Sequence, residues 1–282
     1  MSESARAAAE EFVRLVTIMS TLRSPDGCPW DREQTIDSLK PFVLEEAYEV
    51  IEAVDRHDHD GLREELGDFV FEAVFLAQLE AEAGHFTIAD SLKAVADKLV
   101  RRHPHVFKRH QGEAPIESAG RVKTRWEEIK AEERAAGGDG AATKTLLSGI
   151  APALPALLRA YMIGTRAASV GFDWPRAADV LDKIEEEVAE LREAMTGQPA
   201  APKPAERADV HERAEEEMGD LLFAIANLAR KLGIEPETAL RKANDKFTRR
   251  FTAMERTIEQ RNRSMSAMSL DELEREWQAA KQ

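Results

Sequence analysis

One acidic stretch occurs twice in the 282-residue chain. Residues 216–223 read Glu-Glu-Met-Gly-Asp-Leu-Leu-Phe, and residues 64–71 read Glu-Glu-Leu-Gly-Asp-Phe-Val-Phe. In each copy a Glu and an Asp stand three residues apart at the head of an apolar run. A helix would place both carboxylates on one side, next to its apolar surface. Carboxylates in that position require either a cation or contact with water.

The sequence around the two copies also recurs in the same order. A Glu-Glu-x-x-Glu motif precedes each copy, at 45–49 and 186–190, and a segment with one Lys and two Arg follows each copy, at 97–102 and 245–250. For a chain of this length, such a duplication predicts two domains of about 130 to 140 residues each.

The domain boundaries follow from composition. We place the domains at residues 1–136 and 147–282, joined by a flexible Gly- and Ala-rich linker at 137–146. Within the second domain, the Pro- and Ala-rich segment 197–210 is expected to be a disordered loop.

The pattern of apolar residues predicts an all-α fold, a tandem repeat of two helical bundles. Ala, Leu, Glu and Arg dominate and alternating β-branched runs are nearly absent, which favours helices over strands. Apolar residues recur at helical spacing over 42–55 and 62–83, and a short loop between these segments predicts an antiparallel pair with facing acidic strips. Glu65, Asp68 and Glu72 form one of these strips.

Three local features refine this prediction. Residues 31–34 and 87–90 resemble capping boxes that open helices. The run 221–229 is apolar nearly all round its helical wheel, broken by Asn227, which predicts a helix buried on several sides in a bundle between halves or between chains.

Charge and cysteine content exclude several classes of function. The formal net charge of −14 argues against a nucleic-acid partner, because a phosphate backbone needs a basic surface. The single cysteine, Cys28, cannot form an internal disulfide, and the N-terminus lacks the apolar core of a signal peptide. With no long apolar run to span a membrane, we expect a cytoplasmic protein without a membrane partner.

The repeated acidic residues predict a metal and phosphate site. Each half offers Glu-Glu-x-x-Glu, then Glu-x-x-Asp on the next helix, then Lys and Arg on a third. Converging carboxylates suit Mg²⁺, which prefers about six oxygen ligands at about 2.1 Å, and Mn²⁺ is a possible substitute. Lys and Arg bind phosphate oxygens, so the combination predicts a polyphosphate ligand.

Other interpretations remain open at this point. Acidic helix faces are usually only solvated, and a non-catalytic helical interaction protein with a regulatory role would show the same strips. A di-iron bundle needs Glu-x-x-His on two helices, and the single match, at 82–85, runs into a helix-ending Gly84. One half could also be active while the other serves as a scaffold.

Several motifs together resemble the two-domain MazG nucleoside triphosphate pyrophosphohydrolases, over essentially the whole chain. They are the paired acidic motifs and the segments 27–31, 101–107 and 170–174, which read Gly-Cys-Pro-Trp-Asp, Arg-Arg-His-Pro-His-Val-Phe and Val-Gly-Phe-Asp-Trp. The resemblance implies tandem helical bundles in a homodimer. It also implies Mg²⁺-dependent hydrolysis of NTPs and dNTPs to the monophosphate and pyrophosphate, as house-cleaning of the nucleotide pool, with the preferred base and sugar open.

The resemblance also implies roles for individual residues. The implied metal ligands are Glu187, Glu190, Glu217 and Asp220, and in the first half Glu46, Glu49, Glu65 and Asp68. The implied nucleotide and phosphate contacts are Lys246, Arg250, Trp277 and Lys281, with Lys98 and Arg102 in the first half. Our hypothesis for the general base is Glu186, or its equivalent Glu45, which borders the ligands.

The chain departs from the family in one helix. Before the Gly-Phe-Asp-Trp segment, where relatives tend to be basic and amide-bearing, it has Met162, Gly164 and Thr165. Arg159 and Arg166 lie nearby in the sequence and could compensate.

Overall fold

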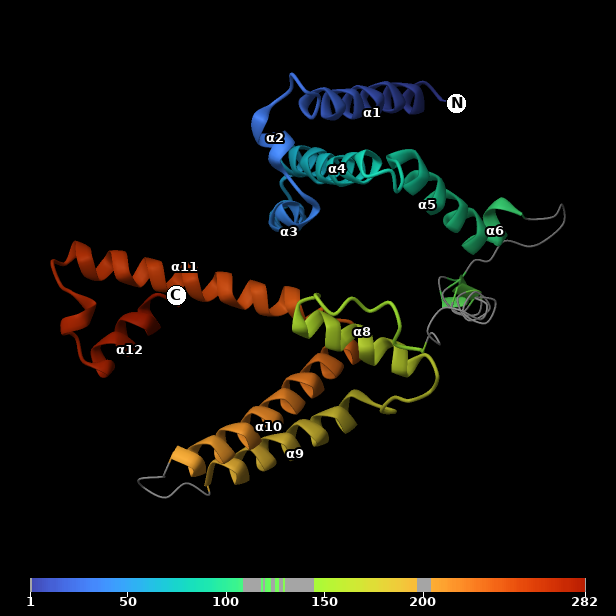
Figure 1. The fold of residues 1–282 in the computed structure, drawn as a ribbon. Helices are drawn as coiled ribbons and strands as arrows, with labels where there is room; N and C mark the ends of the chain where they lie inside the picture. The colour runs from blue at the N-terminus through green and yellow to red at the C-terminus, as the bar shows by residue number, and fades with distance from the viewer. Residues whose placement is uncertain are drawn as a thin grey trace. The chain divides into compact units, whose positions relative to one another are not determined.

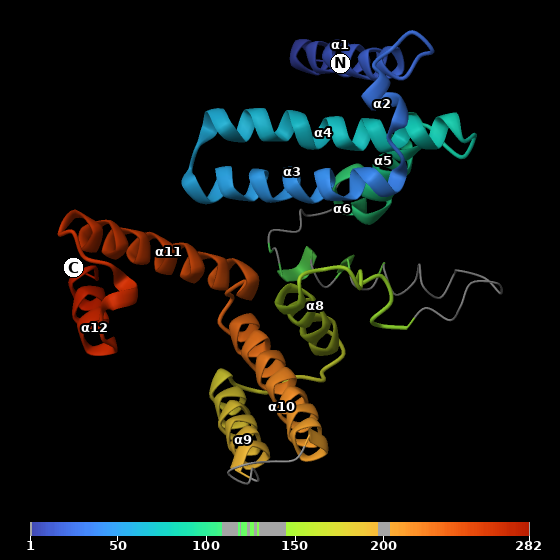
Figure 2. The same ribbon diagram turned by 60° about the vertical axis from the view of Figure 1, so that its left-hand side comes forward.

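A computed structural model describes residues 2–108, 118, 120–122, 125, 126, 129, 145–196 and 204–281. Every regular element in these ranges is a helix, which confirms the all-α prediction (Figures 1 and 2). The chain divides into two compact units, residues 1–129 and 130–282. Residues 137–144 of the predicted linker lie outside the described ranges, so the predicted boundaries stay predictions.

The first unit is organised around a helical hairpin. Its helices are α1 (Glu3–Leu22), α2 (Pro29–Glu33), α3 (Ile36–Arg56), α4 (His59–Glu82), α5 (Ile88–Arg102) and α6 (Pro104–Phe107). Helices α3 and α4 pack along each other, and α1 covers α4. Met19, Leu39, Val74 and Phe75 form the buried core.

The connection between α3 and α4 explains the hairpin. His57 ends α3 in the left-handed conformation, with φ 56°, and the Asp58 carboxylate caps α4 by accepting a hydrogen bond from the Gly61 amide. Two residues therefore join the helices, which forces them to run antiparallel.

The second unit repeats the hairpin. Its helices are α8 (Ala156–Ala168), α9 (Ala177–Thr196), α10 (Pro204–Lys231), α11 (Pro236–Gln260), the 3₁₀ turn η1 (Met265–Ala267) and α12 (Leu270–Ala279). Helices α9 and α10 pack along each other and α8 packs on α10. Helix α11 contacts α8 and α12, and it diverges from the α9–α10 hairpin after its first turns (Figures 1 and 2).

One prediction for this unit is wrong. Residues 204–210, expected in a disordered loop, form the first turns of α10, and residues 197–203 lie outside the described ranges. Pro204 suits a helix start because its fixed φ is helical and its missing N–H is not needed there, and the following Ala, Glu and Arg residues favour a helix.

Burial of helix α10 between halves or between chains stays a prediction, because one chain covers it only in part. Ala224, Ala226 and Asn227 are buried, whereas Leu222 and Ile225 are 44% and 40% exposed. Within one chain, α10 packs on α9 and α8, and part of its apolar surface stays exposed.

Candidate active site

Each hairpin brings three predicted metal ligands together. Carboxylate oxygens of Glu46 and Glu49 on α3 and of Glu65 on α4 lie within 4.8 Å of one another. In the second unit Glu187 and Glu190 on α9 and Glu217 on α10 form an equivalent group within the same limit. The facing acidic strips predicted from the helical spacing are therefore confirmed, and they arise because each antiparallel hairpin places one Glu of α4 or α10 opposite a Glu pair on its partner helix.

The fourth predicted ligand of each cluster lies close enough to act electrostatically. Burial, together with the charges of Asp68 and the neighbouring glutamates, raises the pKa of Glu46 above its ordinary value. Burial, Glu190 and Glu187 raise the pKa of Glu217, and Asp220 contributes to the same shift. Mutual repulsion among carboxylates in this arrangement is relieved by a bound cation.

Each cluster contains a buried carboxylate oxygen that has no hydrogen-bond partner in the described structure. Oε2 of Glu46 and Oε2 of Glu187, the second Glu of each Glu-Glu pair, are buried and have no hydrogen-bond partner in the described structure. Glu187 is only 4% exposed. A buried carboxylate oxygen without a partner is costly, and a divalent cation with hard oxygen ligands would satisfy it. The donor set of both clusters thus fits Mg²⁺.

A lysine to which the sequence analysis assigned no role lies beside the second cluster. The ammonium group of Lys183 lies 2.8 Å from the carboxylate of Glu186 and 2.7 Å from that of Glu187. These two carboxylates raise the pKa of Lys183, so it stays charged. The i, i+4 spacing of Lys183 and Glu187 was the available signal. The predicted general base Glu186 is thereby held at the border of the cluster; Glu186 and its first-half equivalent Glu45 are both exposed.

Glu72, which belongs to the predicted acidic strip but had no assigned role, distinguishes the first cluster. It is 7% exposed, and its Oε2 has no partner in the described structure. Burial and the charges of Glu46 and Asp68 raise its pKa. The equivalent position in the second half is Ala224, and the equivalent of Lys183 in the first half is Phe42. The first cluster therefore has one more carboxylate and no internal lysine.

In the described part of the second unit, the predicted phosphate contacts are not joined to the carboxylates. Lys246 and Arg250 lie on α11, which diverges from the hairpin (Figures 1 and 2). Trp277 on α12 lies 5.0 Å from the Phe247 ring, and the Lys281 ammonium lies 5.6 Å from the Trp277 ring. In the first unit Lys98 and Arg102 lie on α5, which packs on α4 and α6 and buries none of its own residues.

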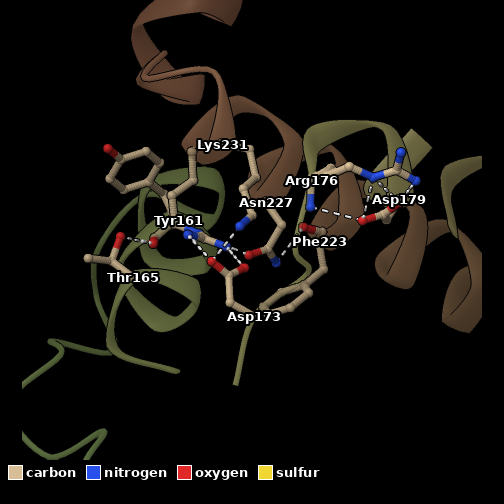
Figure 3. Close-up of polar contacts among 9 residues, drawn as sticks. Tyr161, Thr165, Asp173, Arg176, Asp179, Phe223, Asn227 and Lys231 are labelled. Atoms are coloured by element: carbon tan, nitrogen blue, oxygen red, sulfur yellow. Dashed lines mark hydrogen bonds and ion pairs between the residues drawn. The ribbon is translucent and has the colours of Figure 1, made fainter. Parts of the chain in front are cut away.

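Gly164 in α8 has a packing role. A Cβ on Gly164 would lie 2.2 Å from Oδ1 of Asn227, so the missing side chain lets α8 approach α10. Thr165 donates its hydroxyl to the carbonyl of Tyr161 (Figure 3). Arg166 donates hydrogen bonds to the carbonyls of Leu146 and Ser148 and therefore holds the loop that precedes α8.

The loop after α8 is fastened to α10 by charge. Asp173 accepts hydrogen bonds from Arg230 and, at 2.6 Å, from Lys231 (Figure 3). All three side chains are at most 20% exposed. This ion-pair network lies at the C-terminal end of α10 and holds the Gly-Phe-Asp-Trp segment against the hairpin.

Comparison with known proteins shows that both acidic motifs lie in segments that match a known protein family. The MazG nucleotide pyrophosphohydrolase domain matches residues 34–107 and 177–253, which contain both carboxylate clusters. A nucleoside triphosphate pyrophosphohydrolase of Escherichia coli K12 is 46% identical over 273 residues, covering 95% of this chain and 96% of the relative. The nucleoside triphosphate pyrophosphohydrolase/pyrophosphatase MazG of Thermotoga maritima is 44% identical over 270 residues, covering 96% of this chain and 95% of the relative.

Proposed function

The chain belongs to the MazG nucleotide pyrophosphohydrolase family and is a nucleoside triphosphate pyrophosphohydrolase, and we propose that its clustered carboxylates hold Mg²⁺ for this reaction. The proposed products from NTPs and dNTPs are the nucleoside monophosphate and pyrophosphate. The observation that carries the proposal is the convergence of Glu187, Glu190 and Glu217 within 4.8 Å, around the unpartnered Oε2 of Glu187. The proposed ligand set is completed by Asp220, with Glu46, Glu49, Glu65 and Asp68 as the first-half equivalents.

In the proposed reaction, a water oxygen attacks the α-phosphorus and the bond from this phosphorus to the bridging oxygen of the β-phosphate breaks. When bound, Mg²⁺ supplies positive charge against the phosphate oxygens and the departing pyrophosphate. Glu186 takes the proton of the attacking water as the general base, with Glu45 in the same role in the first half. Lys183 orients Glu186 through their 2.8 Å contact.

Product analysis tests the reaction. With Mg²⁺ and a panel of NTPs and dNTPs, we expect equal amounts of monophosphate and pyrophosphate, and release of diphosphate and orthophosphate would contradict the proposal. Glu190→Gln should lower turnover by about 10²-fold or more if the second half is active, since the neutral amide is a weaker ligand. Glu49→Gln tests the first half in the same way. Glu185→Gln, an exposed position on the same helix, is the matched control.

We also propose that the enzyme acts as a homodimer on the nucleotide pool of the cytoplasm. Both units leave apolar helix faces uncovered within the described chain. In the first unit Leu44 and Val54 are 58% and 51% exposed, and in the second Phe247 is 56% exposed. Faces of this kind are typical of protein interfaces. Sedimentation at micromolar concentration should give twice the mass of one chain, and a monomer would contradict this part of the proposal.

No helix within the described ranges has the length and apolar character required to cross a membrane. A bundle whose acidic strips only contact water would show no turnover with any triphosphate and the same melting temperature with and without Mg²⁺.

A further inference from the structure

The two carboxylate clusters differ at two positions that flank their predicted ligands. In the first unit Glu72 lies on α4, one helical turn beyond the ligands, and the equivalent position in the second unit is Ala224. In the second unit Lys183 lies on α9, one turn before the ligands, and the equivalent position in the first unit is Phe42. When all carboxylates are ionised, the first group of five carboxylates has a formal charge of −5, and the second group of four carboxylates and one lysine has −3. The two clusters are therefore not electrostatically equivalent.

Glu72 is buried beside the first cluster. It is only 7% exposed, and its Oε2 and that of Glu46 have no hydrogen-bond partner among the described residues. Burial raises the pKa of Glu72, and the charged groups that add to this shift, Glu46 and Asp68, are both carboxylates. The pKa of Glu46 is likewise raised by burial and by four carboxylates. Both oxygens thus lie in a buried acidic environment, which a divalent cation with oxygen ligands would stabilise.

Lys183 gives the second cluster an internal cation. Its ammonium group lies 2.8 Å from the carboxylate of Glu186 and 2.7 Å from that of Glu187. In the first unit Phe42 takes this position and packs against the apolar core, with its ring 5.9 Å from that of Trp30. Lys183 neutralises part of the second cluster, and its positive charge repels a metal ion that binds the same carboxylates. Phe42 provides no such charge.

We propose that Glu72 serves the first metal site as a fifth carboxylate, and that the two units therefore hold Mg²⁺ differently. The first unit binds its divalent cation tightly and retains it without nucleotide. The second unit, where Lys183 already balances part of the charge, binds its cation more weakly and takes it up together with the negatively charged triphosphate. This inference rests on the proposed function for the carboxylates as metal ligands, and it adds that the two clusters are not interchangeable.

The charge difference is large enough to separate the affinities of the two sites. A neighbouring charge changes the affinity of a carboxylate for a proton by about 10- to 1,000-fold, and a metal ion responds to the same charges. Glu72 favours cation binding in the first unit, whereas Lys183 opposes it in the second, so the two effects increase the same difference. The dissociation constants of the two sites should therefore differ by about tenfold or more.

Titration of the metal-free full chain with Mn²⁺ tests the role of Glu72. Electron paramagnetic resonance measures free Mn²⁺, and the binding curve should show one tight and one weak class of sites. Glu72→Ala, which introduces the residue found at the equivalent position of the second unit, should weaken the tight class by about tenfold or more. Glu72→Gln keeps the size of the side chain and should act in the same direction. Glu64→Gln, which removes an exposed carboxylate from the same helix, is the matched control and should leave both classes in place. A tight class that neither Glu72 variant weakens would overturn the proposal.

Three further variants assign the two classes to the two units. Glu49→Gln should remove the tight class and Glu190→Gln the weak class, and the opposite assignment would overturn the proposal. Lys183→Met should strengthen the weak class by about tenfold, because it removes the competing charge. An unchanged weak class in this variant would contradict the role of Lys183. Thermal unfolding of each variant shows that it is folded.

The same titration separates this inference from the proposed function. Protein that binds no Mn²⁺, with or without a non-hydrolysable triphosphate, would contradict the proposal that the carboxylates hold a metal. Binding that appears only with the triphosphate, or two sites of equal affinity, would leave the metal-dependent reaction in place and overturn only the difference between the units.

Discussion

The substitution Gly164→Ala in helix α8 has two opposing effects on the stability of the protein. Replacing an interior helical glycine by alanine ordinarily stabilises a helix by about 1 kcal/mol. Here the added methyl carbon would lie 2.2 Å from Oδ1 of Asn227 and 3.1 Å from Nε of Arg230. Asn227 is only 1% exposed, so its side chain has no open space into which it can move.

The size of the destabilisation follows from the contacts that the added methyl group would disrupt. Overpacking a tight contact costs about 1 to 3 kcal/mol. Displacing the Asn227 amide also weakens the hydrogen bond that Arg230 donates to it at 3.3 Å and the one that it donates to the Phe223 carbonyl at 3.3 Å, each worth about 1 kcal/mol. These losses exceed the gain in helix propensity, so we expect a net destabilisation of about 2 kcal/mol.

Urea unfolding followed by circular dichroism measures this change. The midpoint for the second unit should fall with little change in slope. Asn227→Ala provides the matched background, because it removes the obstructing atoms: Gly164→Ala should cost clearly less there, giving a coupling energy of about 1 kcal/mol or more between the two sites. An unchanged or raised midpoint for Gly164→Ala in the natural background would refute the packing argument.

Three further predictions follow from the charges. Asp173→Asn should lower stability by about 2 to 4 kcal/mol in thermal unfolding, because it leaves the mostly buried Arg230 and Lys231 without their anion. Although burial opposes it, hydrogen bonding to these cations lowers the pKa of Asp173, so its contribution is present above the unfolded pKa and is lost as pH falls through the folded value. Mg²⁺ at a hundred times its dissociation constant should stabilise the protein by about 2.7 kcal/mol, and a chelator should reverse the shift in melting temperature. Burial raises the pKa of Glu72, so without metal its favourable contribution is present below the unfolded pKa and is lost as pH rises through the folded value. Glu72→Gln should therefore be more stable than the natural chain at pH 8 and not at pH 4, as measured by thermal unfolding without metal; the same difference at both pH values would contradict this.

Local signals in the sequence predicted helix starts with mixed success. Thr87 and Asp90 form the predicted capping box at the start of α5. The box predicted at residues 31–34 is wrong: Asp31 lies inside α2, and Thr35 with Ser38 forms the box that opens α3. Pro29 begins α2 earlier, because proline fixes a helical φ at a position that needs no N–H.

The sequence alone determined the helical class, the duplication and the convergence of the glutamates. Each of these depends on local spacing: a 3.6-residue period places the acidic residues on one strip, and in the first unit a two-residue connection turns one strip toward the other. The ligand group Glu46, Glu49 and Glu65 could therefore be predicted without knowledge of the tertiary structure, and the duplication predicted its equivalent, Glu187, Glu190 and Glu217.

Only the tertiary structure decided which residues are buried and which course α11 takes. The burial of Glu72, the unpartnered oxygen of Glu187 and the contact of Gly164 with Asn227 depend on how helices pack, which periodicity does not specify. The course of α11 is likewise set by its contacts with α8 and α12. The repeated acidic stretch therefore predicted one wall of the site, whereas the separation of Lys246 and Arg250 from that wall depends on long-range packing.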